Sequence, residues 1–492
     1  MLTTTANRDT RLSFWLRVRE FAVPPSMIEA ATARRSAGDW AAAYAAAGID
    51  VDLDLRRLAR THGRELAARI RTDLRHLAPD LLRWHMPRIA PDGLLRPGLT
   101  VSLARYDQAA DRDSRLPVHL VVRTAPAWAD AGQRISLALW HGPRSAADSS
   151  RHPNLHPHPH PRPDRRFRLD LHRHLWDARR APELRTRSGA DRPPAGGHPP
   201  TDGTVPSGIG CNVDRWADEA RILLHDEGRS GGAVTVRLGA RHRLVLDLAD
   251  PDPHPHPELS GPPVLRIAGA PGDGSASVLP VLPEAATWVP PDLELLRAGA
   301  IGPGRLHPLV AAALVPDRPP PDAPADRSAT RSGARSGHRE GPGAPHLVDC
   351  RGARHRIGLV DGVLAPMDHH PDEVRREELL AALTGTPLPC LQAIDEAHRR
   401  PECLAGVRER LDHGDIAGAL AVVEGLLGPA ALLRSGELRD ELEAAAQQRI
   451  THGLFRAGLA GPSADRPRPD RTDPARPRPH VHRAHPRHAS GR

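Results

Sequence analysis

Lysine is absent from the 492-residue chain, so all 68 side chains counted as Lys or Arg are arginines. A P-loop nucleotide site needs a lysine on the phosphates, a protein kinase needs its strand lysine, and a pyridoxal-phosphate enzyme needs an amine for its Schiff base. Arginine cannot replace a nucleophilic amine because its guanidinium stays protonated at any usable pH. The sequence therefore excludes these three classes of function.

Aromatic residues are scarce, with 4 Phe, 8 Trp and 2 Tyr, whereas the chain has 53 prolines and 42 glycines. The prolines are clustered, and such clusters cannot bury enough apolar surface to fold. We expect ordered parts with cores of Leu, Val, Ile and Ala, separated by disordered segments. The abundance of Ala, Pro, Gly, His and Arg is typical of a high-GC genome, which weakens a functional interpretation of the arginine content.

Cysteine is rare as well, and a disulfide framework is not expected in a chain this long. The four residues are Cys211, Cys350, Cys390 and Cys403. We expect no signal peptide, because charges run through the first 21 residues and no small-residue cleavage site follows. The longest apolar run, 416–433, contains Glu424 and breaks at a Gly-Pro pair. The sequence predicts a cytoplasmic protein with no membrane contact.

The net charge of +8 is concentrated in the tail. Residues 465–492 contain eight arginines and three aspartates, a net charge of +5, so the rest of the chain is nearly balanced. Such a tail can hold nucleic acid weakly and without sequence preference. Aromatic residues are not interleaved with the arginines, so base stacking is not supported. We interpret the tail as a solvated low-complexity segment.

The pattern of elements predicts an α+β protein of several units, with small antiparallel sheets, helical units at both ends and long disordered linkers rich in Pro, Arg and His. We expect an N-terminal extension (1–23), a helical unit with a small β-sheet (24–141), a linker (142–166), a short ordered segment (167–186), a second linker (187–212), a small α+β unit (213–315), a third linker (316–345), a β-hairpin with a helical unit (346–460) and a basic tail (461–492).

Local sequence patterns predict several helices and strands within these units. Ser26 is the predicted N-cap of a helix that follows two prolines, and Pro371 suits the first position of another helix. A hairpin is predicted over 346–360. Three apolar segments between turn signals predict an antiparallel meander, at 99–103, 118–122 and 135–140.

One motif occurs twice, as Gly38-Asp39-Trp40 with Ala43 and as Gly414-Asp415-Ile416 with Ala419. Glycine permits a left-handed turn, aspartate caps the next helix, and alanine allows close helix approach, so each copy predicts a helical hairpin. The second copy resembles the second-helix start of a tetratricopeptide-type repeat and partly resembles an ankyrin helix pair. A solenoid needs about three adjacent units. We therefore favour two separate hairpins over a repeat domain.

The whole chain also resembles a group of uncharacterised proteins from high-GC bacteria, some of which carry C-terminal ankyrin repeats. The segments that carry the resemblance are 21–28, 38–40, 282–284, 291–299 and 306–314. Where such proteins continue into tandem repeats, this chain has one hairpin and a Pro/Arg/His tail. The resemblance implies no reaction.

Gly228-Arg-Ser230-Gly-Gly232 matches the G-x-S-x-G nucleophile elbow. That elbow must follow a strand and open a helix. Here a helix is predicted before the motif and a strand after it. We interpret the motif as a loop.

Two groups of residues could ligate a metal. The first is Asp368, His369, His370, Asp372 and Glu373, whose acids already suit a helix start. The second is Cys390, His398, Cys403 and His413, whose wide spacing differs from the short clips of zinc sites. We interpret both groups as structural. The His-Pro runs at 152–161 and 254–257 can take up transition metals whether or not biology uses them.

No catalytic, cofactor-binding or metal-ligating residue is assigned from the sequence, and no cofactor is expected. The leading hypothesis is a non-enzymatic protein that binds an unidentified protein partner through its terminal helical units. The first alternative is a hydrolase-like enzyme whose site is assembled from distant His, Asp and Glu residues. The second is weak nucleic-acid binding through the arginine-rich tail.

Overall fold

The computed structural model describes residues 2–107, 117–142, 158–192, 210–239, 242–248, 265–268, 278–316, 346–350, 352–360, 363–384, 389–392, 394, 404–427 and 436–461. The chain divides into two compact units. The first unit is Met1–Arg318 together with His452–Arg492, and the second is Pro319–Thr451. Helices and small sheets alternate along both, which confirms the predicted α+β class.

Helices open the first unit: α1 (Leu2–Phe21), α2 (Pro25–Ser36), α3 (Trp40–Ala46), α4 (Leu55–His62), α5 (Arg64–His76) and α6 (Pro79–His85). The prediction that Ser26 is the N-cap of α2 is wrong. The helix begins at Pro25, with Pro24 in the cap position, because proline at the first helical position needs no backbone N–H partner. The hairpin between α2 and α3 is confirmed: Gly38 has φ +76° and the Asp39 carboxylate accepts a bond from the Ala42 amide.

A four-stranded sheet follows, in the order β1 (Ile49–Val51), β6 (Ile135–Trp140), β5 (Val118–Thr124) and β4 (Thr100–Tyr106). β4, β5 and β6 form the predicted antiparallel meander, and β1 adds a parallel strand that was not predicted. A short hairpin of β2 (Arg88–Ile89) and β3 (Leu94–Leu95) precedes it. β4 and β5 are buried almost throughout, so their apolar residues form the centre of the main core.

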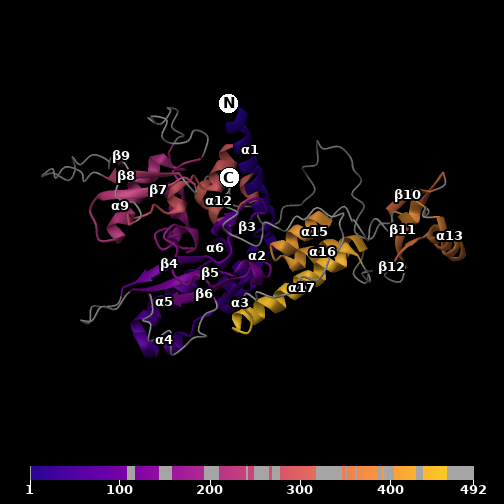
Figure 1. Cartoon of the computed structure of the whole chain (residues 1–492), viewed down its shortest axis with the longest axis horizontal. Helices are drawn as coiled ribbons and strands as arrows, with labels where there is room; N and C mark the ends of the chain where they lie inside the picture. The colour runs from indigo at the N-terminus through magenta and orange to yellow at the C-terminus, as the bar shows by residue number, and fades with distance from the viewer. Residues whose placement is uncertain are drawn as a thin grey trace. The chain divides into compact units, whose positions relative to one another are not determined.

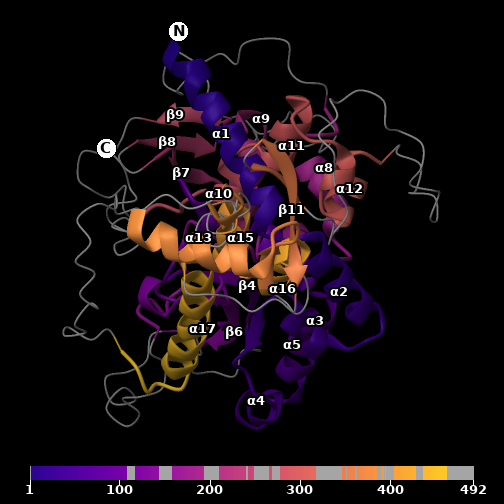
Figure 2. The same ribbon diagram turned by 90° about the vertical axis from the view of Figure 1, so that its right-hand side faces the viewer.

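Segments far apart in the chain complete this core. Residues 164–170 bond along β4, and the chain then continues through the 3₁₀ turns η2 (Arg173–Leu175) and η3 (Ala181–Glu183) and the short helix α8 (Leu184–Arg187). Residues 158–166 fall within the predicted linker 142–166, yet His158 is buried. The helices α11 (Pro291–Arg297) and α12 (Pro308–Leu314) pack into the same core. α11 lies alongside α1, where Arg19 forms a buried ion pair with Asp292 (Figure 2).

A second, smaller core of the first unit lies between a helix and a sheet. α9 (Val213–Asp226) packs on the antiparallel strands β7 (Gly232–Arg237), β8 (Arg243–Leu248) and β9 (Leu265–Ala268) (Figure 1). Val234 and Val236 point toward α9, so Thr235 and Arg237 occupy the opposite face of β7. Thr235 also pairs with Val281, just before α10 (Glu284–Thr287).

The second unit begins with the predicted hairpin, β10 (His346–Cys350) and β11 (Ala353–Val360), and a third strand, β12 (Val363–Pro366), extends it. α13 (Pro371–Thr384) starts at Pro371 as predicted. Residues 389–392 are helical, and α15 (Leu404–Asp412), α16 (Ile416–Leu427) and α17 (Glu437–Arg456) follow. The last residues of α17, from His452 on, belong to the first unit.

The second helical hairpin, α15 with α16, is confirmed: Gly414 has φ +85° and Asp415 accepts from the Gly418 amide at 2.9 Å.

Among the described residues, no helix combines the length and apolarity required to traverse a lipid bilayer.

Candidate functional site

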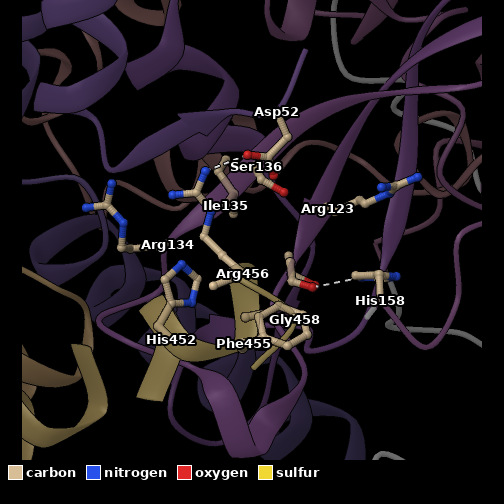
Figure 3. A pocket seen from close by; sticks show the side chains of 13 residues that line it. Asp52, Arg123, Arg134, Ile135, Ser136, His158, His452, Phe455, Arg456 and Gly458 are labelled. Atoms are coloured by element: carbon tan, nitrogen blue, oxygen red, sulfur yellow. Dashed lines mark hydrogen bonds and ion pairs between the residues drawn. The ribbon is translucent and has the colours of Figure 1, made fainter. Parts of the chain in front are cut away.

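The first unit contains a cavity of about 250 Å³ beside the last residues of α17 (Figure 3). Its charged groups are paired: Arg134 bonds Asp50 at 2.7 Å and Arg456 bonds Asp52 at 2.5 Å. Burial raises the pKa of Asp50, but hydrogen bonds from His452 and Arg134 outweigh burial and hold that pKa well below its usual range. These ion pairs hold residues 452–458 against β1 and β6. We therefore interpret the cavity as a gap between packed segments and not as a ligand site.

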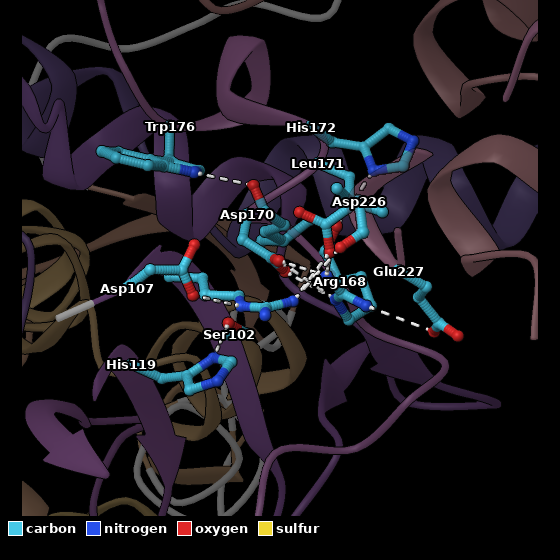
Figure 4. Close-up of polar contacts among 12 residues, drawn as sticks. Ser102, Asp107, His119, Arg168, Asp170, Leu171, His172, Trp176, Asp226 and Glu227 are labelled. Atoms are coloured by element: carbon cyan, nitrogen blue, oxygen red, sulfur yellow. Dashed lines mark hydrogen bonds and ion pairs between the residues drawn. The ribbon is translucent and has the colours of Figure 1, made fainter. Parts of the chain in front are cut away.

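A polar network in the same unit centres on Arg168 (Figure 4). Its guanidinium bonds Asp170 and Asp226, and Arg105 of β4 also pairs with Asp226, which ties β4 to the end of α9. Beside it, the Ser102 Oγ lies 3.0 Å from His119 Nδ1, the geometry of a nucleophile and its base. Ser102 is 0% exposed, however, so no substrate carbonyl can reach its oxygen. The pair therefore has a structural role.

The second unit holds a different cluster. The Sγ atoms of Cys350 and Cys390 and a ring nitrogen of His369 all lie within 4.8 Å of one another. Both cysteines are 0% exposed and are free thiols. Val348 and Leu391 pack around them. Two sulfurs and an imidazole nitrogen at this separation match the first three ligands of a tetrahedral metal site.

The hairpin register adds a fourth candidate ligand. Cys350 pairs with Ala353 and Val348 pairs with His355 across β10 and β11. Because side chains alternate along a strand, Cys350 and His355 occupy the same face of the sheet as diagonal neighbours. The ring centroids of His355 and His369 are 4.2 Å apart. His355 therefore lies at the edge of the cluster.

Two imidazole nitrogens in this cluster lack a hydrogen-bond partner among the described residues: His355 Nδ1 and His369 Nε2, both buried. The other nitrogen of His369, Nδ1, lies 3.4 Å from the carboxylate of Glu373, in the first turn of α13. A carboxylate behind one ring nitrogen fixes the tautomer and directs the other nitrogen to a metal. This arrangement leaves Nε2 as the metal-facing atom of His369.

An ion pair fixes the two histidines relative to each other. Arg356, next to His355, bonds Asp368, next to His369, through its guanidinium at 2.6 Å and through its backbone amide at 2.7 Å. The side-chain hydrogen bond from Arg356 lowers the pKa of Asp368 to about 2, so the pair stays charged. The contact joins β11 to the turn before α13.

The surroundings of Cys390 favour the protonated form of its thiol. Burial, together with the hydrogen bond to Cys350, raises the pKa of Cys390 to about 11. A metal ion binds the thiolate, so it would displace both protons on binding. A buried thiol with a raised pKa is a poor nucleophile, which argues against a nucleophilic role for the free Cys390 thiol.

This cluster contains residues from both groups that the sequence analysis considered as possible metal ligands. From the first group, His369 is in the cluster and Glu373 stands behind it, whereas His370 and Asp372 are exposed. From the second group only Cys390 is present. His398 and Cys403 lie outside the described residues, and His413 is no member of a described ligand cluster. The sequence assigned no metal-ligating residue, whereas the structure brings Cys350, His369 and Cys390 together.

The other sequence candidates do not converge. Gly228 to Gly232 lies between α9 and β7, which confirms the loop interpretation. Most of the His-Pro runs, 152–157 and 254–257, lie outside the described residues, and the described His158 bonds the Thr124 carbonyl instead. The missed residues were Cys350 and His355. The register of the predicted hairpin carried the signal that could have found them.

Comparison with known proteins gave no match: no protein-family model, no curated protein and no solved structure is similar to this chain.

Proposed function

We propose that this is a zinc-binding protein in which Cys350, His369 and Cys390, with His355 as the fourth ligand, hold a structural Zn²⁺. The observation that carries the proposal is the convergence of two buried free thiols and a histidine nitrogen within 4.8 Å. These residues come from β10, the turn before α13 and the helical residues 389–392. A metal would therefore tie together three segments of the second unit.

The ligand set supports zinc over the other divalent metals. Thiolate with imidazole is the combination that Zn²⁺ prefers at structural sites, whereas Mg²⁺ and Ca²⁺ prefer oxygen. Four protein ligands would fill the tetrahedron and leave no position for a reactive water. This supports a structural metal over a catalytic one.

The small apolar core of this unit is the physical reason why a metal would stabilise it. Around the cluster the two cysteines pack with the partly buried Val348 and Leu391, and the other described buried apolar residues of 346–394 are Ile357 and Ile394. The α15–α17 helices have a separate core of five buried residues. Cores of this size supply little folding free energy, and small units with such cores are commonly held by a metal.

We further propose that the unit so held binds another protein and that the chain is not an enzyme. Leu379 and Leu380 on α13 are exposed by 64% and 48%, close to the cluster in sequence, and offer apolar contact area. A cytoplasmic location is part of the proposal, because thiolate ligands require reduced cysteines and the described cysteines are free.

Cobalt substitution tests the zinc site. Co²⁺ bound to thiolates gives a sulfur-to-cobalt charge-transfer band, and we expect one equivalent to saturate the band in the full-length chain. Cys390→Ser should remove most of the band. The matched control is Cys211→Ser, which alters a free cysteine of the first unit and should leave the band unchanged. A band that is absent in the wild type, or equally weakened by both changes, contradicts the proposal.

A further inference from the structure

Arginines surround a second pocket of the first unit, with a volume of about 360 Å³. They come from two places: the segment before Phe167, and the facing ends of β7 and β8. The arginines are Arg162, Arg165, Arg166, Arg237 and Arg243, and the remaining lining residues are Pro163, Asp164, Thr235 and Val281.

The pocket carries an excess of positive charge. Among the described residues, two carboxylates oppose the five guanidinium groups: Asp164 in the lining and Glu284, which pairs with Arg166. The resulting net charge is +3. Arg162, Arg237 and Arg243 form no ion pair with any residue that the structure describes. The protein's own acids therefore leave this site positively charged.

The strand register brings two of these charges together. Arg237 and Arg243 are direct partners across β7 and β8. Like charges placed opposite each other destabilise a sheet. Burial lowers the pKa of Arg237, and the neighbouring charges of Arg166 and Arg243 lower it further. Folding alone does not explain this arrangement, whereas a bound anion would offset the repulsion.

Unpaired donors line the same pocket. Thr235, on the same face of β7 as Arg237, is 3% exposed, and its Oγ1 has no hydrogen-bond partner among the described residues. Its backbone is fixed by bonds with Pro280 and Leu282. The Nε atoms of Arg166 and Arg237 are buried and also lack acceptors within the described parts of the chain. Buried donors are ordinarily satisfied, so these point to a missing acceptor.

We propose that this pocket binds the phosphate groups of a small phosphorylated molecule, with the arginines and the Thr235 hydroxyl as donors. Guanidinium groups match phosphate oxygens in geometry and charge. The volume lies within the range of small-molecule sites, roughly 300–1,000 Å³. No aromatic side chain is among the described lining residues, so the stacking surface that single-stranded nucleic acids use is missing. The site is independent of the proposed zinc centre.

Calorimetric titration of the full-length chain with inorganic pyrophosphate tests the proposal. The wild type should bind, and the double variant R237Q/R243Q should bind about tenfold more weakly or worse, because two charge-assisted bonds are lost. The matched control, R71Q/R75Q, removes the same charge from exposed positions on α5 and should change the affinity by less than about twofold. The arginine-rich tail is intact in both variants.

Melting temperature separates a ligand role from a packing role. Without pyrophosphate, R237Q/R243Q should melt at or above the wild-type temperature because the repulsion is relieved. With pyrophosphate, the wild type should gain stability and the variant should not. A lower melting temperature of the unliganded variant would show that the arginines serve packing.

Three titration results would also overturn the proposal: no binding by the wild type, equal weakening in both double variants, or binding of a short single-stranded DNA at these arginines that pyrophosphate does not displace.

Discussion

Glu373 is the residue whose removal probes the geometry of the metal centre most selectively. Its carboxylate lies 3.4 Å from His369 Nδ1 and touches none of the thiols in the described contacts. Glu373→Ala removes the acceptor that orients the imidazole and leaves every proposed ligand in place. We expect weaker zinc binding with no change in the number of bound ions.

The expected size follows from the contact. Loss of such a carboxylate behind a zinc-bound histidine lowers metal affinity by about 10- to 100-fold. The Glu373 side chain is 43% exposed and its contact is long, so solvent screens it and the lower end applies. We expect about a tenfold increase in the dissociation constant, which is about 1.4 kcal/mol. Glu373→Gln keeps an acceptor and should fall between the wild type and the alanine variant.

Competition with a chromophoric zinc chelator at fixed pH measures these constants. The control is Asp372→Ala. The Asp372 carboxylate lies in the same first turn of α13, but it contacts the exposed His370 and not His369. Both alanine variants lose a similar interaction with the helix dipole. Equal effects of the two substitutions would refute the orientation argument, and so would an affinity that Glu373→Ala leaves unchanged.

Three further predictions concern the fold. Asp292→Ala should lower the free energy of unfolding in urea by about 3–5 kcal/mol, because it leaves the Arg19 charge buried without its partner. R19M/D292L removes both charges and should lower it less, so a double variant as unstable as the single one would contradict the prediction. Burial lowers the pKa of His158, 8% exposed, from 6.5 to about 4. The unfolded chain therefore takes up a proton before the folded chain does, and between pH 6.5 and 4 His158 should reduce the free energy of unfolding by about 3 kcal/mol as pH falls. His158→Gln should flatten the pH profile by that amount, and an unchanged profile would refute the assignment. Asp39→Ala should lower the free energy of unfolding by about 1 kcal/mol, because a helix cap is lost. Asp415→Ala should lower it more, because Asp415 caps a helix and also pairs with Arg410 at 2.9 Å. Thermal unfolding that gives the reverse order would contradict this prediction.

Local signals in the sequence predicted the elements well where the physics is local. The two Gly-Asp turns form because glycine adopts positive φ and aspartate bonds the next helix, and both causes act within a few residues. The three meander strands follow from apolar runs between turns. Ser26 failed as a cap because Pro24 and Pro25 already define the helix start.

The pairing of β1 with β6 could not be predicted in the same way. Ile49 meets Ile135 across 85 intervening residues, and three residues of strand carry too weak a pattern to identify a parallel partner. The packing of α11 against α1 is equally non-local, since it depends on the buried pair of Arg19 and Asp292.

The metal cluster lies between these cases. Cys350 and His355 sit in a hairpin that the sequence predicted, and its register places them on one face. His369 lies in the turn before α13, and Cys390 lies in the helical residues 389–392. No ligand spacing in the sequence links these two residues to the hairpin. Short ligand clips are recognisable in a sequence because both ligands share one turn. A site with one ligand per segment needs the fold.

X-ray absorption at the zinc edge of the full-length chain tests directly whether the two cysteines and two histidines hold a zinc ion. We expect one Zn²⁺ per chain with two sulfur neighbours at about 2.3 Å and two nitrogen neighbours at about 2.0–2.1 Å. In Cys350→Ser the sulfur contribution should fall to one neighbour. A first shell of oxygen atoms alone, or a spectrum that Cys350→Ser leaves unchanged, would contradict the proposed centre.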